Sequence, residues 1–104
     1  MSELQIDGPR LLEKLDELGQ IGMSTNGVNR VALTDEDKLG RDRVVAWMQE
    51  LDLEVRVDQI GNIFGIRAGR NDSAKPPLMT GSHIDSVIGA GTLGLMDALE
   101  KHQT

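Results

Sequence analysis

The amino-acid sequence predicts a small α/β fold, with two or three helices and a small sheet. Two kinds of hydrophobic spacing indicate this. Leucines recur at the three- and four-residue intervals of a helix at Leu11, Leu12, Leu15 and Leu18. Apolar and charged residues alternate from Leu53 to Val57, as they do in a half-buried strand. A chain of 104 residues allows at most one small domain with a modest core.

The first helix is expected from Asp7 to Leu18. Aspartate is a favoured helix N-cap, and Pro9 suits the first turn, where its missing N–H costs nothing. The helix should end near Gly19. The small, polar stretch from Gly22 to Val28 is expected to be a loop.

The second helix should begin at Thr34, because Thr34 and Asp37 approximate a capping box. Asp35 and Glu36 suit the positive end of the helix dipole. The apolar residues near one face are Leu39, Val44, Trp47, Met48 and Leu51. The acidic run over residues 34–38 resembles a carboxylate cluster for a metal, but a solvated helix start explains it without chemistry, and we predict that it is structural.

The strand over Leu53–Val57 and a second over Asn62–Arg67 are separated by a four-residue turn, which predicts a hairpin. Residues 69–77 are rich in turn formers and should be a solvated loop. Leu78–Thr80 is expected to be a short buried strand that delivers His83 at its carboxyl end, where open α/β sheets place ligands. A last short helix is expected over Leu93–Lys101.

Composition excludes several classes of partner. The net charge of −6 disfavours binding to nucleic acid and to anionic membranes, and two aromatic residues, Trp47 and Phe64, offer no platform for stacking bases. There is no cysteine, so any metal would need His, Asp or Glu ligands. No signal-peptide pattern or membrane-length apolar run is present, and the expected location is cytoplasmic.

The strongest candidate for chemistry is a His-x-Asp pair. His83 offers an imidazole nitrogen to a divalent metal, and Asp85 is placed to orient that ring. The small residues Gly81 and Ser82 would let a ligand approach closely. The alternative is a partly buried histidine whose hydrogen bonds are satisfied within the fold.

Three other features are weaker candidates. The stretch Gly89–Gly94 matches G-x-G-x-x-G, but only ten residues follow it, too few for the second strand and ribose-binding acid of a dinucleotide site. We predict a flexible glycine loop there. Asn62, directly after a glycine, indicates turn chemistry. His102, close to the end of the sequence, is a poor ligand candidate.

Three ordered motifs resemble one family of enzymes. They are Gly27-Val28-x-Arg30-x-Ala32-Leu33-Thr34-Asp35-Glu36-Asp37-x-x-Gly40-Arg41-Asp42, then Asp58-x-Ile60-Gly61-Asn62-Ile63-Phe64-Gly65, and Gly81-Ser82-His83-Ile84-Asp85-Ser86-Val87. Over about residues 5–92 the chain resembles the amino-terminal part of the hydantoinase/carbamoylase amidases. These include N-carbamoyl-L-amino-acid hydrolases, beta-ureidopropionases and allantoate amidohydrolases, relatives of zinc aminoacylases and di-zinc exopeptidases.

The resemblance implies that residues 1–104 are an incomplete amino-terminal part of a zinc-exopeptidase-like catalytic domain, of the aminoacylase/carboxypeptidase type. It implies a metal-dependent hydrolase of non-peptide carbon–nitrogen bonds in linear amides. The substrate of full-length relatives would be a small N-carbamoyl or ureido compound, and the assembly a homodimer. The cofactor would be a divalent metal, zinc first, with manganese, cobalt or nickel as alternatives.

By the same resemblance His83 would be the first metal ligand and Asp85 the residue that orients it. The family's metal-bridging aspartate falls on Gly94, which cannot bind a metal through its side chain, and Asp97 and Glu100 are out of register. We therefore expect a truncated or frame-disrupted fragment that neither holds a metal stably nor hydrolyses substrate alone. The alternative is a non-catalytic interaction or assembly module.

Overall fold

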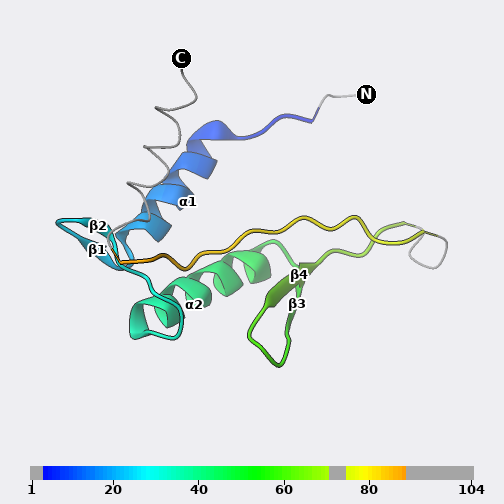
Figure 1. The fold of residues 1–104 in the computed structure, drawn as a ribbon. Helices are drawn as coiled ribbons and strands as arrows, with labels where there is room; N and C mark the ends of the chain where they lie inside the picture. Colours follow the sequence, from blue (N-terminus) through cyan, green and yellow to red (C-terminus); the bar gives the residue numbers. More distant parts are fainter. Residues whose placement is uncertain (1–3, 71–74, 89–104) are drawn as a thin grey trace, which may run out of the picture. The chain divides into compact units, whose positions relative to one another are not determined.

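The computed structural model describes residues 4–70 and 75–88. Its elements, in chain order, are α1 (Gly8–Gln20), β1 (Met23–Ser24), β2 (Gly27–Val28), α2 (Asp35–Glu50), β3 (Glu54–Val57) and β4 (Ile63–Ile66) (Figure 1). The strands form two antiparallel pairs, β1 with β2 and β3 with β4. The predicted class of a small α/β fold with two helices is confirmed for this part of the chain.

The chain divides into two units. One holds the described residues up to Gly40 together with those from Ile84 onward, and the other is Arg41–His83. The first unit contains the buried residues Val28, Arg30 and Asp37, which are 2%, 7% and 7% exposed. Within the described ranges Val28 is the only buried hydrophobic side chain. None of the helices in those ranges is long and apolar enough to cross a membrane.

Helix α1 begins where its cap residue predicts. The Asp7 carboxylate accepts a hydrogen bond from the Arg10 backbone N–H at 3.1 Å, and Pro9 lies in the first turn. The helix continues to Gln20, two residues beyond the predicted end, and the Ile21 N–H donates to the Leu18 carbonyl at 3.1 Å. No residue of α1 is buried, so its apolar leucines remain accessible.

The expected loop over residues 22–28 is wrong in part, because it contains the β1–β2 hairpin, with Met23 opposite Val28. The Ser24 hydroxyl donates to the Gly27 carbonyl at 2.7 Å and accepts from the Asn26 N–H at 3.2 Å. Asn26 and Gly27 are typical turn residues, but strands of two residues are too short to show an alternating pattern. The turn chemistry was therefore visible in the sequence and the strands were not.

Helix α2 confirms the predicted start and corrects its capping. The Thr34 hydroxyl accepts from the Asp37 N–H at 3.2 Å, as in a capping box. The Asp37 carboxylate accepts instead from the Leu33 N–H at 3.1 Å, while the Thr34 N–H bonds the Val31 carbonyl. Asp37 is buried, so the predicted solvated start holds for Asp35 and Glu36 and is wrong for Asp37.

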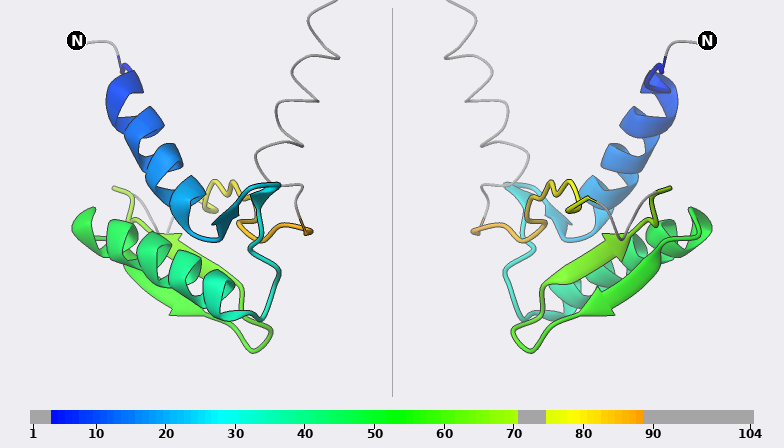
Figure 2. Two further views of the ribbon diagram at one scale, coloured as in Figure 1. Left: turned by 90° about the vertical axis from the view of Figure 1, so that its left-hand side faces the viewer. Right: turned by 90° about the vertical axis from the view of Figure 1, so that its right-hand side faces the viewer.

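The β3–β4 hairpin forms in the predicted place, with register from Glu54 opposite Ile66 to Val57 opposite Ile63. Within this unit the hairpin lies along the second half of α2 (Figure 2). Contact is close at Gly65, where an added Cβ would lie 2.9 Å from Leu53 Cδ1 and 3.0 Å from Met48 Sδ. Glycine at this position lets the strand approach the helix side chains.

The turn between β3 and β4 is organised by one carboxylate. Asp58 accepts from the backbone N–H of Ile60 at 3.1 Å, from the backbone N–H of Asn62 at 2.8 Å and from Asn62 Nδ2 at 2.8 Å. Gly61 has φ +91°, in the left-handed region that glycine tolerates. The prediction that Asn62 serves turn chemistry is confirmed.

These hydrogen bonds predict that the β3–β4 hairpin weakens in acid. The bonds from Asn62 lower the pKa of Asp58 below its ordinary value. A carboxylate with a lowered folded-state pKa stabilises the fold above its unfolded pKa of about 4, and that stabilisation is lost as the pH falls through the folded value. Asp58→Asn should therefore destabilise the chain at pH 6 and have a smaller effect near pH 3, measured by urea unfolding.

Asp16→Asn is the control, since Asp16 is exposed and outside the turn. A difference between wild type and Asp58→Asn that stays constant from pH 6 to pH 3 would contradict the assignment.

The predicted buried strand over Leu78–Thr80 is wrong. Residues 75–88 have no regular secondary structure, and Leu78 and Met79 are 101% and 76% exposed. A strand requires a neighbour to take its backbone hydrogen bonds, and neither described sheet pairs with this segment. The described residues of the 69–77 loop are irregular and exposed, as predicted. The helix expected over Leu93–Lys101 and the loop over Gly89–Gly94 lie outside the described residues.

Candidate functional site

The His-x-Asp pair follows the irregular segment. His83 is exposed, whereas Ile84, Asp85 and Ser86 are half-buried. A Cβ added to Gly81 would meet nothing within 4 Å, so the structure shows no close approach that requires glycine there.

The residues after His83 are tied to a distant part of the sequence by Arg30. Its Nε donates to the Ile84 carbonyl at 2.8 Å. Its Nη1 donates to the carbonyls of Leu18 and Ile21 at 2.8 and 2.7 Å. One buried guanidinium therefore connects the end of α1 with the segment that follows His83.

A second set of hydrogen bonds joins residues 28–30 to Ser86, through backbone groups and the Ser86 hydroxyl. The Arg30 N–H donates to Ser86 Oγ at 2.9 Å, and the Ser86 N–H donates to the Arg30 carbonyl at 2.8 Å. Ser86 Oγ in turn donates to the Val28 carbonyl at 3.0 Å. We call the side chain and backbone of Arg30, with its partners Ile84 and Ser86, the Arg30 clasp.

Two carboxylates partly offset the cost of burying the Arg30 cation. Burial lowers the pKa of the Arg30 guanidinium, and Asp37 and Asp85 offset part of that effect. An arginine remains charged at neutral pH despite such a shift, so the unit holds a buried cation near both carboxylates. Gly40 leaves room for this cation, since a Cβ there would lie 2.9 Å from Arg30 Cδ.

Sequence reasoning did not assign a role to Arg30. It appeared only as a letter of the first family motif, although it is a charged residue between the apolar residues Val28 and Val31. A charged residue between apolar residues indicates a side chain that is buried with its hydrogen bonds satisfied.

The residues that the structure describes do not make a metal site by themselves. Among them no group of three or more His, Asp or Glu side chains is close enough to hold an ion. Among these residues the acidic start of α2 is likewise not such a group. His83 would therefore need ligands from outside the described residues.

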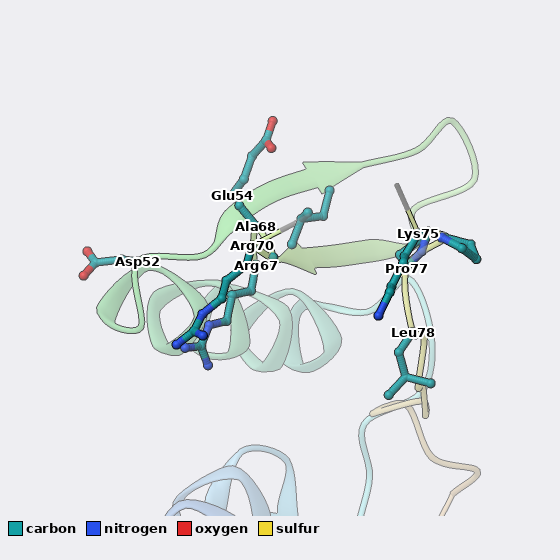
Figure 3. Close-up of a pocket in the computed structure, with 11 residues that line it drawn as sticks. Asp52, Glu54, Arg67, Ala68, Arg70, Lys75, Pro77 and Leu78 are labelled. Atoms are coloured by element: carbon teal, nitrogen blue, oxygen red, sulfur yellow. The ribbon is translucent and has the colours of Figure 1, made fainter. Parts of the chain in front are cut away.

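An open depression of about 840 Å³ lies in the unit Arg41–His83 (Figure 3). Its charged lining residues are Asp52, Glu54, Arg67, Arg70 and Lys75. The lining does not include His83, and it mixes charges of both signs on exposed residues. It provides no arrangement of groups for catalysis.

Comparison with known proteins places these features in context. No family model matches the chain. It is 38% identical over 104 residues to the N-carbamoyl-L-amino acid amidohydrolase of Geobacillus stearothermophilus, covering 95% of this chain and 25% of that protein. It is 36% identical over 104 residues to the ureidoglycolate hydrolase of Arabidopsis thaliana, covering 95% and 22%.

Its fold is similar to that of a hydantoinase/carbamoylase family amidase from Burkholderia multivorans, with a TM-score of 0.76 and 42% identity, over 94% of this chain and 26% of that one. The chain thus spans about a quarter of the length of the relatives it matches. The resemblance read from the three sequence motifs is confirmed by both sequence and fold.

Proposed function

We propose that this chain is the amino-terminal part of the catalytic domain of a hydantoinase/carbamoylase amidase. Such an enzyme hydrolyses carbon–nitrogen bonds other than peptide bonds, in small linear amides of the N-carbamoyl amino acid, ureidopropionate or allantoate type. The observation that carries the proposal is that the same segment agrees with amide hydrolases in both sequence identity and fold. The zinc-exopeptidase-like character of the domain and a homodimeric assembly are part of the proposal.

His83 is proposed as the first metal ligand and Asp85 as the residue that orients it. An exposed imidazole is accessible to a metal, and a carboxylate that accepts the other ring N–H fixes the tautomer that binds. Zinc is the proposed metal, with manganese, cobalt and nickel as alternatives. When bound, it would polarise a carbonyl and activate water.

Because only His83 matches the family's ligands and Gly94 stands at the position of the bridging aspartate, the isolated chain should be inactive. We expect no ammonia release from N-carbamoyl amino acids with added zinc, manganese, cobalt or nickel, measured beside the Geobacillus enzyme as a positive control. Metal-dependent ammonia release that disappears in His83→Ala would contradict this.

A chimaera tests the function itself. Replacing the part of the Geobacillus enzyme that matches residues 5–92 by those residues, so that the enzyme keeps its own metal-bridging aspartate, should give a protein that hydrolyses N-carbamoyl amino acids. In the chimaera His83→Ala should reduce kcat/KM by at least about a hundredfold, because loss of one ligand disrupts the metal site. Ser24→Ala is the control, since Ser24 lies outside the His-x-Asp segment, and it should leave activity unchanged. A fully active His83→Ala chimaera would overturn the assignment.

A second candidate is an interaction or assembly module without catalysis. The exposed large apolar side chains favour it, since such surfaces mark contacts with other polypeptides. In the first unit they include Leu11, Leu12 and Leu15, and in the second Leu78 and Met79. The partner would be a polypeptide corresponding to the remainder of an amidase.

Native mass spectrometry distinguishes the two candidates. The chain would be mixed with the Geobacillus enzyme lacking its matched segment, with zinc present. A stable complex without zinc or activity supports the module, and a zinc-loaded, active complex supports the enzyme.

A further inference from the structure

We propose that Arg30 is a positioning residue, which holds Ile84–Ser86 in place and thereby orders the segment that carries Asp85 before any ligand binds. The inference rests on the proposed function, because that function gives Asp85 its role beside His83. It adds a residue 54 positions away from Ile84 in the sequence.

The first argument is the number of partners that the guanidinium serves. Arg30 is 7% exposed, and its side chain donates to three backbone carbonyls at 2.7 to 2.8 Å. Two of these carbonyls, Leu18 and Ile21, are at the carboxyl end of α1, where cations are favourable. The third is the carbonyl of Ile84, the residue directly after His83. The planar fork of arginine can serve all three, and a lysine ammonium lacks this geometry.

The second argument is the two-way bond with Ser86. The Arg30 backbone both donates to Ser86 Oγ and accepts from the Ser86 N–H. Ser86 Oγ then donates to the carbonyl of Val28, which is the buried hydrophobic residue of the described chain. The side chain and the backbone of Arg30 thus bind both neighbours of Asp85.

The third argument concerns Asp85 itself. It is half-buried and lies in the field of the Arg30 cation. An arginine that served only α1 would need the Leu18 and Ile21 bonds alone. The bonds to Ile84 and Ser86 restrict the backbone on each side of Asp85, and a carboxylate on a restricted backbone loses less entropy when it orients a ligand.

Amide hydrogen exchange by NMR tests the clasp in the whole chain. The Asn29 N–H, bonded to the Gly22 carbonyl at 2.7 Å, is an internal reference in the same unit. In Arg30→Lys and in Ser86→Ala we expect the amide of residue 86 to exchange about tenfold faster, the equivalent of one lost hydrogen bond. Asn29 should change by less than about threefold.

Ser24→Ala is the matched control. Ser24 is also a half-buried serine; its hydroxyl donates to the Gly27 carbonyl and accepts from the Asn26 N–H and from Asn29 Nδ2, and none of these partners belongs to the clasp. It should leave the exchange of Ser86 unchanged. In the chimaera Ser86→Ala should lower kcat several-fold with KM unchanged, and Ser24→Ala should lower neither.

Equal acceleration at Asn29 and residue 86 in Arg30→Lys would reduce Arg30 to a general stabiliser of the fold and overturn the proposal. If that variant fails to fold, Ser86→Ala decides, since unchanged exchange at residue 86 would also overturn it. An active His83→Ala chimaera with a normal clasp would instead refute the proposed function, so the two failures are distinguishable.

Discussion

Arg30→Met is expected to cost about 3–5 kcal/mol of unfolding free energy, the range for removing one partner from a buried charge network. Methionine approximates the length of the side chain but leaves the carbonyls of Leu18, Ile21 and Ile84 without their donor. It also removes the positive charge near Asp37 and Asp85. A folded domain has about 5–15 kcal/mol of unfolding free energy in total, so this loss is a large share of its stability. Urea unfolding followed by far-UV circular dichroism, which reports on α1 in the same unit as Arg30, measures the effect.

Arg10→Met is the control for this change. The Arg10 side chain is 66% exposed and lies 4.0 Å from the Asp7 carboxylate, as an exposed ion pair of the weak class. Its loss should cost at most about 1 kcal/mol. An Arg30→Met protein as stable as Arg10→Met would show that the buried cation does not hold the fold together.

Gly22→Ala is expected to cost about 2–4 kcal/mol, from left-handed strain and overpacking together. Gly22 has φ +83°, and an added Cβ would lie 2.5 Å from the Asn29 carbonyl oxygen and 3.0 Å from its carbon. Both are backbone atoms, which cannot rotate away as a side chain can. Relief of the clash would stretch the 2.7 Å bond from the Asn29 N–H to the Gly22 carbonyl.

Gly19→Ala provides the comparison. Gly19 is inside α1, and a Cβ there would meet nothing within 4 Å. Alanine should be neutral or stabilise by about 0.5–1 kcal/mol, because glycine is a poor helix former. Thermal unfolding of both variants gives the contrast. Gly22→Ala with the stability of wild type would mean that the loop adopts another conformation in solution.

Local patterns predicted most of the elements. Hydrogen bonds between residues only a few positions apart form the helix caps at Asp7 and Thr34 and the turn at Asp58. Such hydrogen bonds depend mainly on the local sequence, so they can be predicted from the spacing of residues along the chain. Leu78–Thr80 was the contrary case, because an apolar run becomes a strand only when a neighbouring strand pairs with it.

The residues of the candidate site likewise divide into those that the sequence indicated and those that it did not. His83 and Asp85 were found by residue type and spacing, and their proposed roles follow from the resemblance to amidases. The burial of Asp37 and the role of Arg30 were not found. Charged side chains are expected to be exposed to solvent. Only the surrounding contacts show that hydrogen bonds compensate for the burial of these two.

By itself the sequence determined the two helices, the β3–β4 hairpin and the resemblance to one amidase family, and it led to the proposal of His83 as a ligand. The tertiary structure decided which charged groups are buried, that Leu78 and Met79 are exposed, and that Arg30 binds Ser86, 56 residues further along the chain. The reason is physical. Hydrogen bonds within a helix or a turn join near neighbours, whereas burial and long-range contacts depend on which segments the folded chain brings together.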